Sequence, residues 1–374
     1  MKINIDLRGA SGFGGIVNFK RNIAVQLAQI KEVELNGCYN WLRGMNRKKY
    51  SWFQSNLHKS IIPDQFVYHY ALKLGYQLPF SYELMMNSRK DLNLFLTYNL
   101  PQVKFKSPVV ATIHDIILLK TSSENKTMRD THEKILRDTI NKSIHILTVS
   151  ESAKNDLIEY FSLSPNMISV VHNGITHELF KEELSEDKKR LVKKKYNLPN
   201  RFILYMGNYR KHKNIERLLE AYSLLPIDIR KDLKLVITAR SKELEVFASK
   251  LKIQHDTIFC GFVDEMDKCA IYKSSEIVYY ASLYEGFGVP IIEAQACGIP
   301  VITSNISSMP EASGGFAEHV NPYNVTEIYQ AIIRLIDNTE HRNSIISGGY
   351  INSELYTWKR GAEEVYNVLN SIMR

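Results

Sequence analysis

The sequence predicts an α/β fold in two domains, each built on a parallel sheet with helices on both faces. Short runs of β-branched and aromatic residues alternate with longer helical patterns through most of the 374 residues. Several of these runs, such as 202–206, are apolar at every position, as expected for strands that are covered on both sides. A chain of this length can form two domains, each with its own core, and two domains imply a cleft.

The expected strands fall into two groups that are separated by a charged segment. The first group is 2–7, 92–98, 109–113, 144–149 and 168–172, and the second is 202–206, 234–239, 276–281 and 300–303. The segment 181–190 carries dense mixed charge without a strand pattern, which predicts a linker and a surface helix. We therefore place the domain boundary within 175–197.

Composition and charge exclude several classes of protein. The chain is 44% hydrophobic and 24% charged, which is ordinary for a globular protein. No run reaches the roughly 18 apolar residues of a membrane span, and residues 1–6 alternate in polarity unlike a signal peptide, so a cytoplasmic location is expected. The four cysteines form no CxxC pair, which predicts packed, reduced thiols and no metal. The net charge of +8 favours an anionic partner.

A glycine-rich turn over 9–15 follows the first expected strand and precedes a helical pattern over 16–27. Backbone N–H groups in such a turn can approach an anion at the positive end of the helix dipole. The turn fits neither the GxGxxG fingerprint nor a Walker A loop, which weakens the case for hydride transfer or ATP hydrolysis. A tight turn that needs positive φ and binds nothing is the alternative.

The strand expected at 109–113 ends in two polar residues, His114 and Asp115. Ligands of open parallel sheets bind beyond the carboxyl ends of the strands, so His114 is expected at the binding site. A structural histidine is the alternative. Asp115 is equally well explained as the N-cap of a helix.

The strand expected at 202–206 is followed by a crowded basic turn over 210–213, before a helical pattern over 215–225. Cations beside a helix N-terminus oppose the helix dipole unless something anionic is bound there. A bound diphosphate would remove that conflict. The alternative is a solvated basic turn.

The most informative segment places Glu285 and Glu293 between a strand and a helix, with Pro290 suited to the first helical turn. Gly286 and Gly288 leave backbone N–H groups able to face a ligand. Both carboxylates can look into one cleft and accept hydrogen bonds from vicinal hydroxyls, which sugars and riboses carry. The alternative is a structural role for two negative charges near a helix N-terminus.

Taken together, these segments resemble a retaining glycosyltransferase of the GT-B fold, and more narrowly glycosyltransferase family 4. Glu285 and Glu293 match that family's E-x7-E motif within an EGFGxPxxEAxAxGxPV stretch over 285–301. The resemblance continues through 304–311, and earlier in the chain through 148–152 and 171–174.

The resemblance implies two Rossmann-like domains with parallel sheets that face each other across a cleft. The acceptor-binding domain is expected over 1–180 and the nucleotide-sugar-binding domain over 198–357. The final helix, within 358–374, is expected to cross back to the first domain.

The resemblance also implies a role for each candidate residue. The donor diphosphate would be lined by Gly12, Gly14 and Gly15 and bound by Lys213. The donor sugar would be contacted near its reacting carbon by His114, and its hydroxyls would be held by Glu285 with the amides of Phe287 and Gly288. The ribose would be bound by Glu293. His114 and Glu285 are thus the expected catalytic residues. Many family members carry arginine after the glycine that matches Gly207, but this chain has Asn208, so Arg210 or Lys211 is expected to supply that charge.

Neither a metal nor another cofactor is expected. Fixed cations and amide dipoles can stabilise the negative charge that develops on a departing diphosphate. The sequence also contains no Asp-x-Asp motif of the kind that metal-dependent glycosyltransferases use.

The overall run resembles bacterial polysaccharide and O-antigen mannosyltransferases. Transfer of mannose from GDP-mannose to a saccharide or lipid-linked saccharide, in surface polysaccharide or lipopolysaccharide O-antigen biosynthesis, is therefore the first expectation, and UDP-glucose, UDP-N-acetylglucosamine and dTDP-rhamnose remain open as donors. A nucleotide-sugar epimerase and an inert nucleotide-sugar-binding partner are the alternatives. Nucleic acid is not expected as a partner, because it would leave Glu285 and Glu293 unexplained.

The segment 41–53 interleaves cations with large aromatic residues. This mixture suits peripheral contact with an anionic membrane surface at the inner face of the membrane. A solvated acceptor loop is the alternative.

Overall fold

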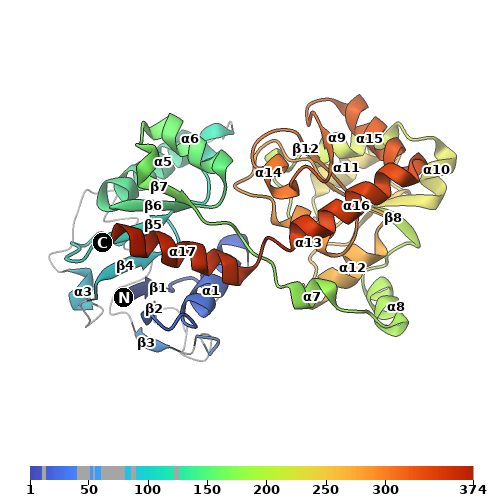
Figure 1. The fold of residues 1–374 in the computed structure, drawn as a ribbon. Coiled ribbons are helices and arrows are strands. Elements are labelled where there is room, and N and C mark those ends of the chain that lie inside the picture. The colour runs from blue at the N-terminus through green and yellow to red at the C-terminus, as the bar shows by residue number, and fades with distance from the viewer. Residues whose placement is uncertain are drawn as a thin grey trace. The chain divides into compact units, whose positions relative to one another are not determined.

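The computed structural model describes residues 1–10, 14–39, 51–53, 55–59, 81–85, 90–121 and 126–373. The chain divides into two compact units, one made of Met1–Gly174 with Trp358–Arg374 and the other of Ile175–Thr357. Each unit contains one parallel sheet with helices packed around it (Figure 1). The predicted α/β class with two Rossmann-like sheets is confirmed.

The sheet of the first unit has the strand order β3-β2-β1-β4-β5-β6-β7, and every neighbouring pair is parallel. Its strands are β1 Lys2–Asp6, β2 Glu34–Tyr39, β3 Asn56–Lys59, β4 Leu92–Phe95, β5 Val109–Thr112, β6 His145–Thr148 and β7 Ile168–Val170. Its α-helices are α1 Gly15–Leu27, α3 Tyr82–Met85, α4 Ile117–Lys120, α5 Lys126–Lys142, α6 Glu151–Phe161 and α17 Trp358–Ile372. A short 3-10 helix, Pro165–Met167, precedes β7.

A ladder of buried amides crosses the centre of this sheet. The Asn36 amide donates to Asn4 Oδ1 at 2.9 Å, and the Asn4 amide donates to Asn93 Oδ1 at 3.0 Å. The Asn93 amide in turn donates to Glu83 Oε1 at 2.9 Å. Because a slip of one residue would leave these buried groups unpaired, the ladder helps to fix the register of β2, β1 and β4.

The C-terminal helix α17 packs on α1 within the first unit. Its buried face contains Ala362, Val365 and Leu369, and its first residue, Trp358, makes an edge contact with Phe19 of α1 at 6.4 Å. The return of this helix to the first unit is therefore as the sequence predicted.

The second unit has a sheet of strand order β10-β9-β8-β11-β12-β13, again wholly parallel. The strands are β8 Arg201–Tyr205, β9 Leu233–Ile237, β10 Thr257–Phe259, β11 Ile277–Tyr280, β12 Val301–Ser304 and β13 Glu318–Val320. The α-helices are α7 His177–Lys181, α8 Glu186–Lys195, α9 Ile215–Ser223, α10 Ile227–Asp232, α11 Lys242–Lys250, α12 Lys268–Ser274, α13 Val289–Ala296, α14 Met309–Ser313, α15 Val325–Asp337 and α16 Thr339–Ser353. Two 3-10 helices, Lys211–Lys213 and Glu265–Asp267, complete the unit.

The connections in this sheet change direction between β8 and β11. The chain leaves β8 toward β9 on one side and reaches β11 on the other, so the carboxyl ends of β8 and β11 are neighbours. Such a switch point is where doubly wound sheets bind their ligands. The two most informative segments of the sequence, 207–213 and 284–294, follow these two strands.

The range 175–197, within which the domain boundary is expected, belongs to the second unit, and so does the segment 181–190 that is expected to form a linker and a surface helix. The helix is present as α8, which buries Val192 and packs on α12. Within the described residues, no helix combines the length and the hydropathy that a bilayer crossing requires.

Candidate active site

The turn after β8 and the loop after β11 bring a lysine and a glutamate together in the second unit. Lys213 Nζ lies 2.6 Å from Glu285 Oε1 and also donates to the Tyr280 hydroxyl at 2.9 Å. The Tyr280 hydroxyl donates to Glu285 Oε1 at 3.0 Å. The main chain joins the same two segments, since Leu283 N donates to the carbonyl oxygen of His212 at 2.7 Å.

This ion pair is largely withdrawn from water. The side chains of Lys213 and Glu285 are 14% and 11% exposed. Burial alone would raise the pKa of the Glu285 carboxyl, but the Lys213 ammonium, with smaller contributions from Ser282 and His212, outweighs burial and holds the pKa below its usual 4.5. Glu285 is therefore a carboxylate at neutral pH, and burial keeps the Tyr280 pKa far above its ordinary value, so the phenol stays protonated.

The loop that carries Glu285 is fixed by two serines that follow β12. Ser308 Oγ, fully buried, bonds to the carbonyl oxygens of Glu285 and Phe287 at 3.0 and 2.7 Å, and Ser307 Oγ bonds to the Glu285 main chain. The loop ends at Gly288, whose φ of 119° at the N-cap of α13 requires glycine. The Phe287 ring is buried against Tyr356.

Glu293, in α13, has a different set of partners. Its Oε2 accepts a hydrogen bond from the Tyr272 hydroxyl at 2.8 Å, and its Oε1 lies 3.4 Å from Lys268 Nζ. Both partners come from α12. The two glutamates of the motif thus each combine a lysine and a tyrosine, but from different elements.

Two cations of the basic turn, Arg210 and Lys211, have different surroundings. Lys211 contacts Glu243 at 2.5 Å and Glu216 at 3.5 Å. Arg210 is exposed, and its guanidinium has no hydrogen bond or ion pair with the part of the chain that the structure describes. Of the two residues expected to replace the missing arginine, Arg210 is thus the one whose charged group is not paired with a carboxylate of the described residues.

His114 lies in the first unit, directly after β5. It is 6% exposed, its Nε2 is 3.3 Å from the carbonyl oxygen of Leu96, and Phe19 packs edge-on against its ring at 4.9 Å. Burial lowers the pKa of His114 to about 4, with a smaller contribution from Lys20. His114 is thus a neutral imidazole at physiological pH, suited to orienting a ligand rather than adding a positive charge.

The glycine-rich turn precedes α1 in the same unit. Gly14 is the N-cap of α1 with a φ of 120°, and Gly15 is the first residue of the helix. Among the described residues, a Cβ at either position would meet no neighbour, and the positive φ of Gly14 is the conformational reason for the glycine there. Gly12 lies outside the described residues.

Sequence reasoning missed a buried charge cluster in the first unit. The Arg8 guanidinium pairs with both oxygens of Asp6, at 2.6 and 3.0 Å, and Lys20 Nζ donates to the Arg8 carbonyl oxygen at 2.7 Å. All three residues are at most 6% exposed. The available signal was the two opposite charges, Asp6 and Arg8, placed two residues apart where the first strand ends.

Sequence reasoning also missed the two tyrosines. Tyr280 occupies a strand position and Tyr272 a buried helix position, so both look like core residues in the sequence. Only the polar partners that the fold supplies distinguish their hydroxyls from ordinary buried phenols.

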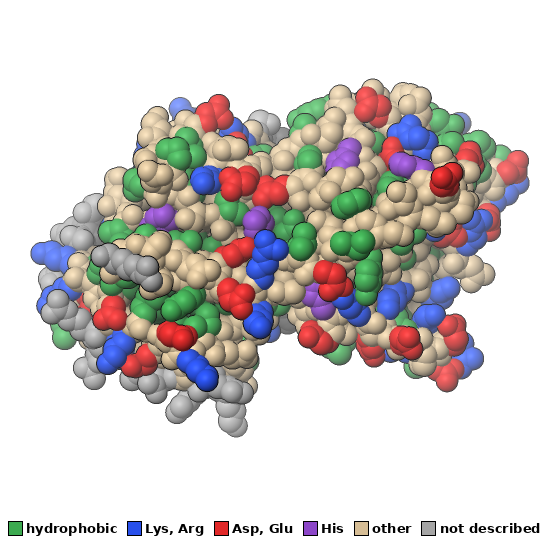
Figure 2. Space-filling view, in the orientation of Figure 1, with side chains coloured by type: hydrophobic (Ala, Val, Ile, Leu, Met, Phe, Trp, Pro, Cys, Tyr) green, Lys and Arg blue, Asp and Glu red, His purple; other side chains and the backbone are tan. Residues whose placement is uncertain are grey.

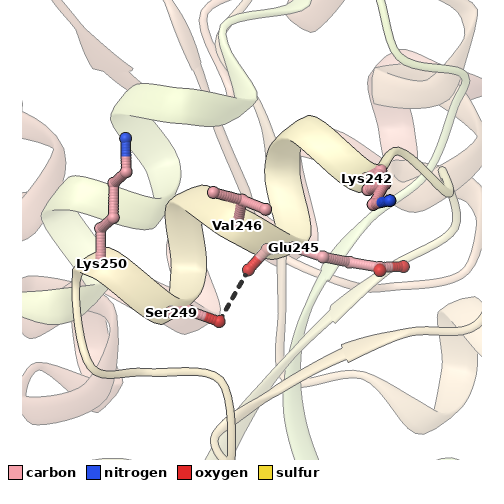
Figure 3. A pocket seen from close by; sticks show the side chains of 5 residues that line it. All are labelled: Lys242, Glu245, Val246, Ser249 and Lys250. Carbon is pink, nitrogen blue, oxygen red and sulfur yellow. Dashed lines mark hydrogen bonds between the residues drawn. The ribbon is translucent and has the colours of Figure 1, made fainter.

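Two surface features lie apart from these residues. A hollow along α11 is lined by Lys242, Glu245, Val246, Ser249 and Lys250, none of which the sequence singled out (Figure 3). On the face shown in Figure 2, acidic and basic side chains are interspersed on both units. Because the two signs are mixed, the net positive charge forms no single basic surface on that face.

Two family models match the chain. The model "Glycosyltransferase Family 4" matches residues 92–179, and "Glycosyl transferases group 1" matches residues 186–351. Together they span more than half of the chain, one match in each half.

Relatives with known descriptions are distant. Serotype-specific mannosyltransferase WbdA of Escherichia coli is 26% identical over 71% of this chain and 34% of its own length. O-antigen chain mannosyltransferase B of Escherichia coli is 28% identical over 69% of each chain. This chain thus spans about a third of the length of WbdA.

Solved structures confirm the fold over the whole chain. Sucrose-phosphate synthase of Thermosynechococcus elongatus superposes with a TM-score of 0.74 at 17% identity, covering 99% of this chain and 98% of the other. Anabaena Alr3699/HepE, solved in complex with UDP and glucose, gives a TM-score of 0.73 at 15% identity, covering 99% and 100%. At such identities the likeness establishes the fold alone.

Proposed function

Because this chain belongs to the glycosyltransferases, with a family 4 region followed by a group 1 region, we propose that it is a retaining enzyme that transfers a hexose from a nucleoside diphosphate sugar. The observation that carries this proposal is the buried pair of Lys213 and Glu285 at the β8/β11 switch point. A diphosphate and a sugar hydroxyl are the ligands that an ammonium and a carboxylate bind at such a place.

The chemistry follows from where charge develops. When the bond from the sugar to the diphosphate breaks, negative charge grows on the leaving phosphate, and cations fixed beside it lower the barrier. Lys213 and Arg210 supply those cations, and the N-terminus of α13 at Gly288 adds backbone dipoles. Glu285 orients the sugar through its hydroxyls, and Glu293 binds the ribose.

The first unit supplies the remaining roles. His114, neutral and held by Leu96, orients the donor sugar near the reacting carbon, while the turn at Gly14 and Gly15 offers N–H groups to the diphosphate. The acceptor binds to this unit. The leaving phosphate helps to deprotonate the acceptor hydroxyl, which attacks from the face that the phosphate leaves.

GDP-mannose is the donor that we propose first. It is supported by the description of both Escherichia coli relatives as mannosyltransferases, and the description of one of them as an O-antigen chain mannosyltransferase supports a saccharide or lipid-linked saccharide as acceptor. The complex of Anabaena Alr3699/HepE with UDP and glucose keeps UDP sugars as the second candidate.

The test is a calorimetric and thermal-shift panel of GDP, UDP, dTDP and ADP with their sugar conjugates, in the presence of EDTA. A ligand that binds the folded state raises its apparent stability by mass action. We expect GDP and GDP-mannose to give the largest shift, without metal. Preference for another base would replace the donor, and no response from folded protein to any nucleotide would contradict the proposed activity.

Peripheral contact with an anionic membrane is proposed from the cationic and aromatic segment 41–53. Residues 41–50 lie outside the described residues, while Trp52 lies near Phe53 and beneath the Arg21 guanidinium. Reversing two charges, with Lys48→Glu and Lys49→Glu, should reduce flotation with anionic vesicles. Unchanged flotation would contradict the proposal.

A further inference from the structure

The Tyr280 hydroxyl is hydrogen-bonded to both members of the Lys213–Glu285 ion pair. It accepts a hydrogen bond from Lys213 Nζ at 2.9 Å and donates one to Glu285 Oε1 at 3.0 Å. The Lys213 ammonium also lies 5.2 Å from the centre of the Tyr280 ring. Tyr280 is 3% exposed, so its hydroxyl is bound to this site and not to water.

A bound donor changes the charge balance around Glu285. In the proposed function Lys213 is the cation that binds the diphosphate, so part of its charge is then directed away from the carboxylate. Besides Lys213 and Tyr280, Glu285 is faced by Ser282 and by His212, and burial lowers the pKa of His212 to about 4, so His212 adds no positive charge at neutral pH. Glu285 is only 11% exposed, and a largely buried carboxylate that loses its counter-charge takes up a proton more readily. A protonated Glu285 would be a hydrogen-bond donor at one oxygen, and could no longer accept bonds from sugar hydroxyls at both.

We propose that Tyr280 is the positioning residue that keeps Glu285 ionised and oriented while Lys213 is engaged with the donor diphosphate. The inference rests on the proposed function and names a residue that the E-x7-E motif does not contain. The physical basis is that the phenol is a donor without a formal charge. It can hold the carboxylate without competing with Lys213 for the phosphate, whereas a second cation in its place would compete.

The chain offers a matched control in the next residue. Tyr279 is also fully buried in β11, but its side chain faces the other side of the strand, where its hydroxyl contacts the main chain and amide of Asn214 at 3.5 and 3.4 Å. Tyr279→Phe and Tyr280→Phe therefore each remove one buried hydroxyl from the same strand. Only the second removes a hydrogen bond to Glu285.

The experiment compares the pH profiles of kcat and KM for the wild type, Tyr280→Phe and Tyr279→Phe, using the donor identified by the nucleotide panel. For Tyr280→Phe we expect kcat at neutral pH to fall about tenfold or more, KM for the donor to change less than about threefold, and the acidic limb of the kcat profile to move up by about one pH unit. Tyr279→Phe should keep the wild-type profile. Thermal unfolding of both variants reports how much stability each hydroxyl contributes.

The possible failures are distinguishable. If Tyr280→Phe keeps the wild-type acidic limb and kcat in an active enzyme, or if both variants change kcat equally with the same loss of stability, the positioning role is overturned. If the wild type neither binds a nucleotide nor transfers a sugar, the proposed function fails instead. Lys213→Ala further separates the proposed function from the positioning role of Tyr280. Lys213→Ala should raise the dissociation constant of the nucleoside diphosphate, whereas Tyr280→Phe should leave that constant nearly unchanged.

Discussion

At the scale of single residues, Arg210 and Lys211 show how neighbours decide which cation can serve a ligand. The two are adjacent in the sequence and equal in charge. Lys211 is already held by Glu243 and Glu216, and moving it to a phosphate would sacrifice those contacts. Arg210 would lose no ion pair with the described residues on binding a phosphate.

Arg210→Ala should therefore weaken binding of the nucleoside diphosphate about tenfold or more, the range expected for a lost hydrogen bond between charged groups. Lys211→Ala should weaken it less than about threefold. Isothermal calorimetry with the nucleotide selected by the panel measures both. The reverse order of effects would show that Lys211, and not Arg210, replaces the arginine missing at Asn208.

The buried His114 makes the free energy of unfolding depend on pH. Its pKa is about 4 in the folded chain against an ordinary 6.5, mainly because of burial. The lower folded value means that acid favours the unfolded chain. The stabilising contribution is complete above pH 6.5 and is lost as the pH falls from 6.5 toward 4.

His114→Gln should therefore make the decline in stability between pH 6.5 and 4 less steep, by at most about 1.4 kcal/mol per pH unit. Urea unfolding at a series of pH values measures the slope. His255→Gln, at an exposed position, is the matched control and should leave the slope as in the wild type. Equal slopes for the wild type and His114→Gln would contradict the assignment of a buried, neutral imidazole.

At the scale of elements, the sequence predicts most strands from their short runs of apolar, β-branched and aromatic residues. The strands β1, β4 to β7, β8, β9, β11 and β12 all fall within one residue of an expected segment at their N-terminal ends. The strand β2 was missed because Asn36 and Gly37 interrupt its apolar pattern. That interruption is tolerable only because Asn36 is paired with Asn4 across the sheet, a fact that no local pattern contains.

In the candidate site, too, local patterns are predicted from the sequence and pairings between distant residues are not. The E-x7-E pattern identifies Glu285 and Glu293, because the spacing within one loop and helix is local. It does not reveal that Glu285 pairs with Lys213, which lies 72 residues earlier. The pairing depends on β8 and β11 being neighbours, which is a property of the sheet order.

The helix α17 meets the first unit at a point where only glycine fits. A Cβ on Gly361 would lie 2.9 Å from the carbonyl oxygen of His172 and 3.0 Å from Ile23 Cδ1. Gly361→Val should therefore lower the stability of the first unit by about 1 to 3 kcal/mol. Thermal unfolding measures this loss.

Lys359→Val, at a position that is 79% exposed on the same helix, is the control. It places valine in the same helix without the overlap, and valine is only slightly less favourable than lysine in a helix, so it should change stability by only a few tenths of a kcal/mol. Because glycine is itself a poorer helix former than valine, a loss at Gly361→Val no larger than that at Lys359→Val would contradict close packing on His172 and α1 as the reason for the glycine.

At the scale of the whole molecule, the two units differ in how the chain builds them. The second unit is one continuous segment whose ends pair with each other, since Ile175 and Thr357 form a parallel bridge and Ile175 N donates to the Tyr356 carbonyl oxygen at 3.1 Å. The first unit is assembled from Met1–Gly174 and the separate segment Trp358–Arg374. The second unit thus has the form of a domain inserted into the first.

This architecture predicts that residues 175–357 fold when expressed alone, whereas residues 1–174 do not. The second unit has a complete six-stranded sheet and its own buried core. Without α17, the first unit would expose the face of α1 that contains Phe19 and Ile23, and supplying 358–374 as a peptide should restore its cooperative unfolding.

The isolated second unit should also bind the nucleoside diphosphate, because Lys213, Glu285, Tyr280 and Glu293 all lie within it. We expect its affinity to be weaker than that of the full chain, since the glycine-rich turn before α1 and His114 belong to the first unit. Circular dichroism melting and calorimetry of the fragment test folding and binding separately. The fragment could instead melt cooperatively and bind no nucleotide that the full chain binds. That outcome would show that binding of the nucleotide, and not only of the sugar, requires the first unit.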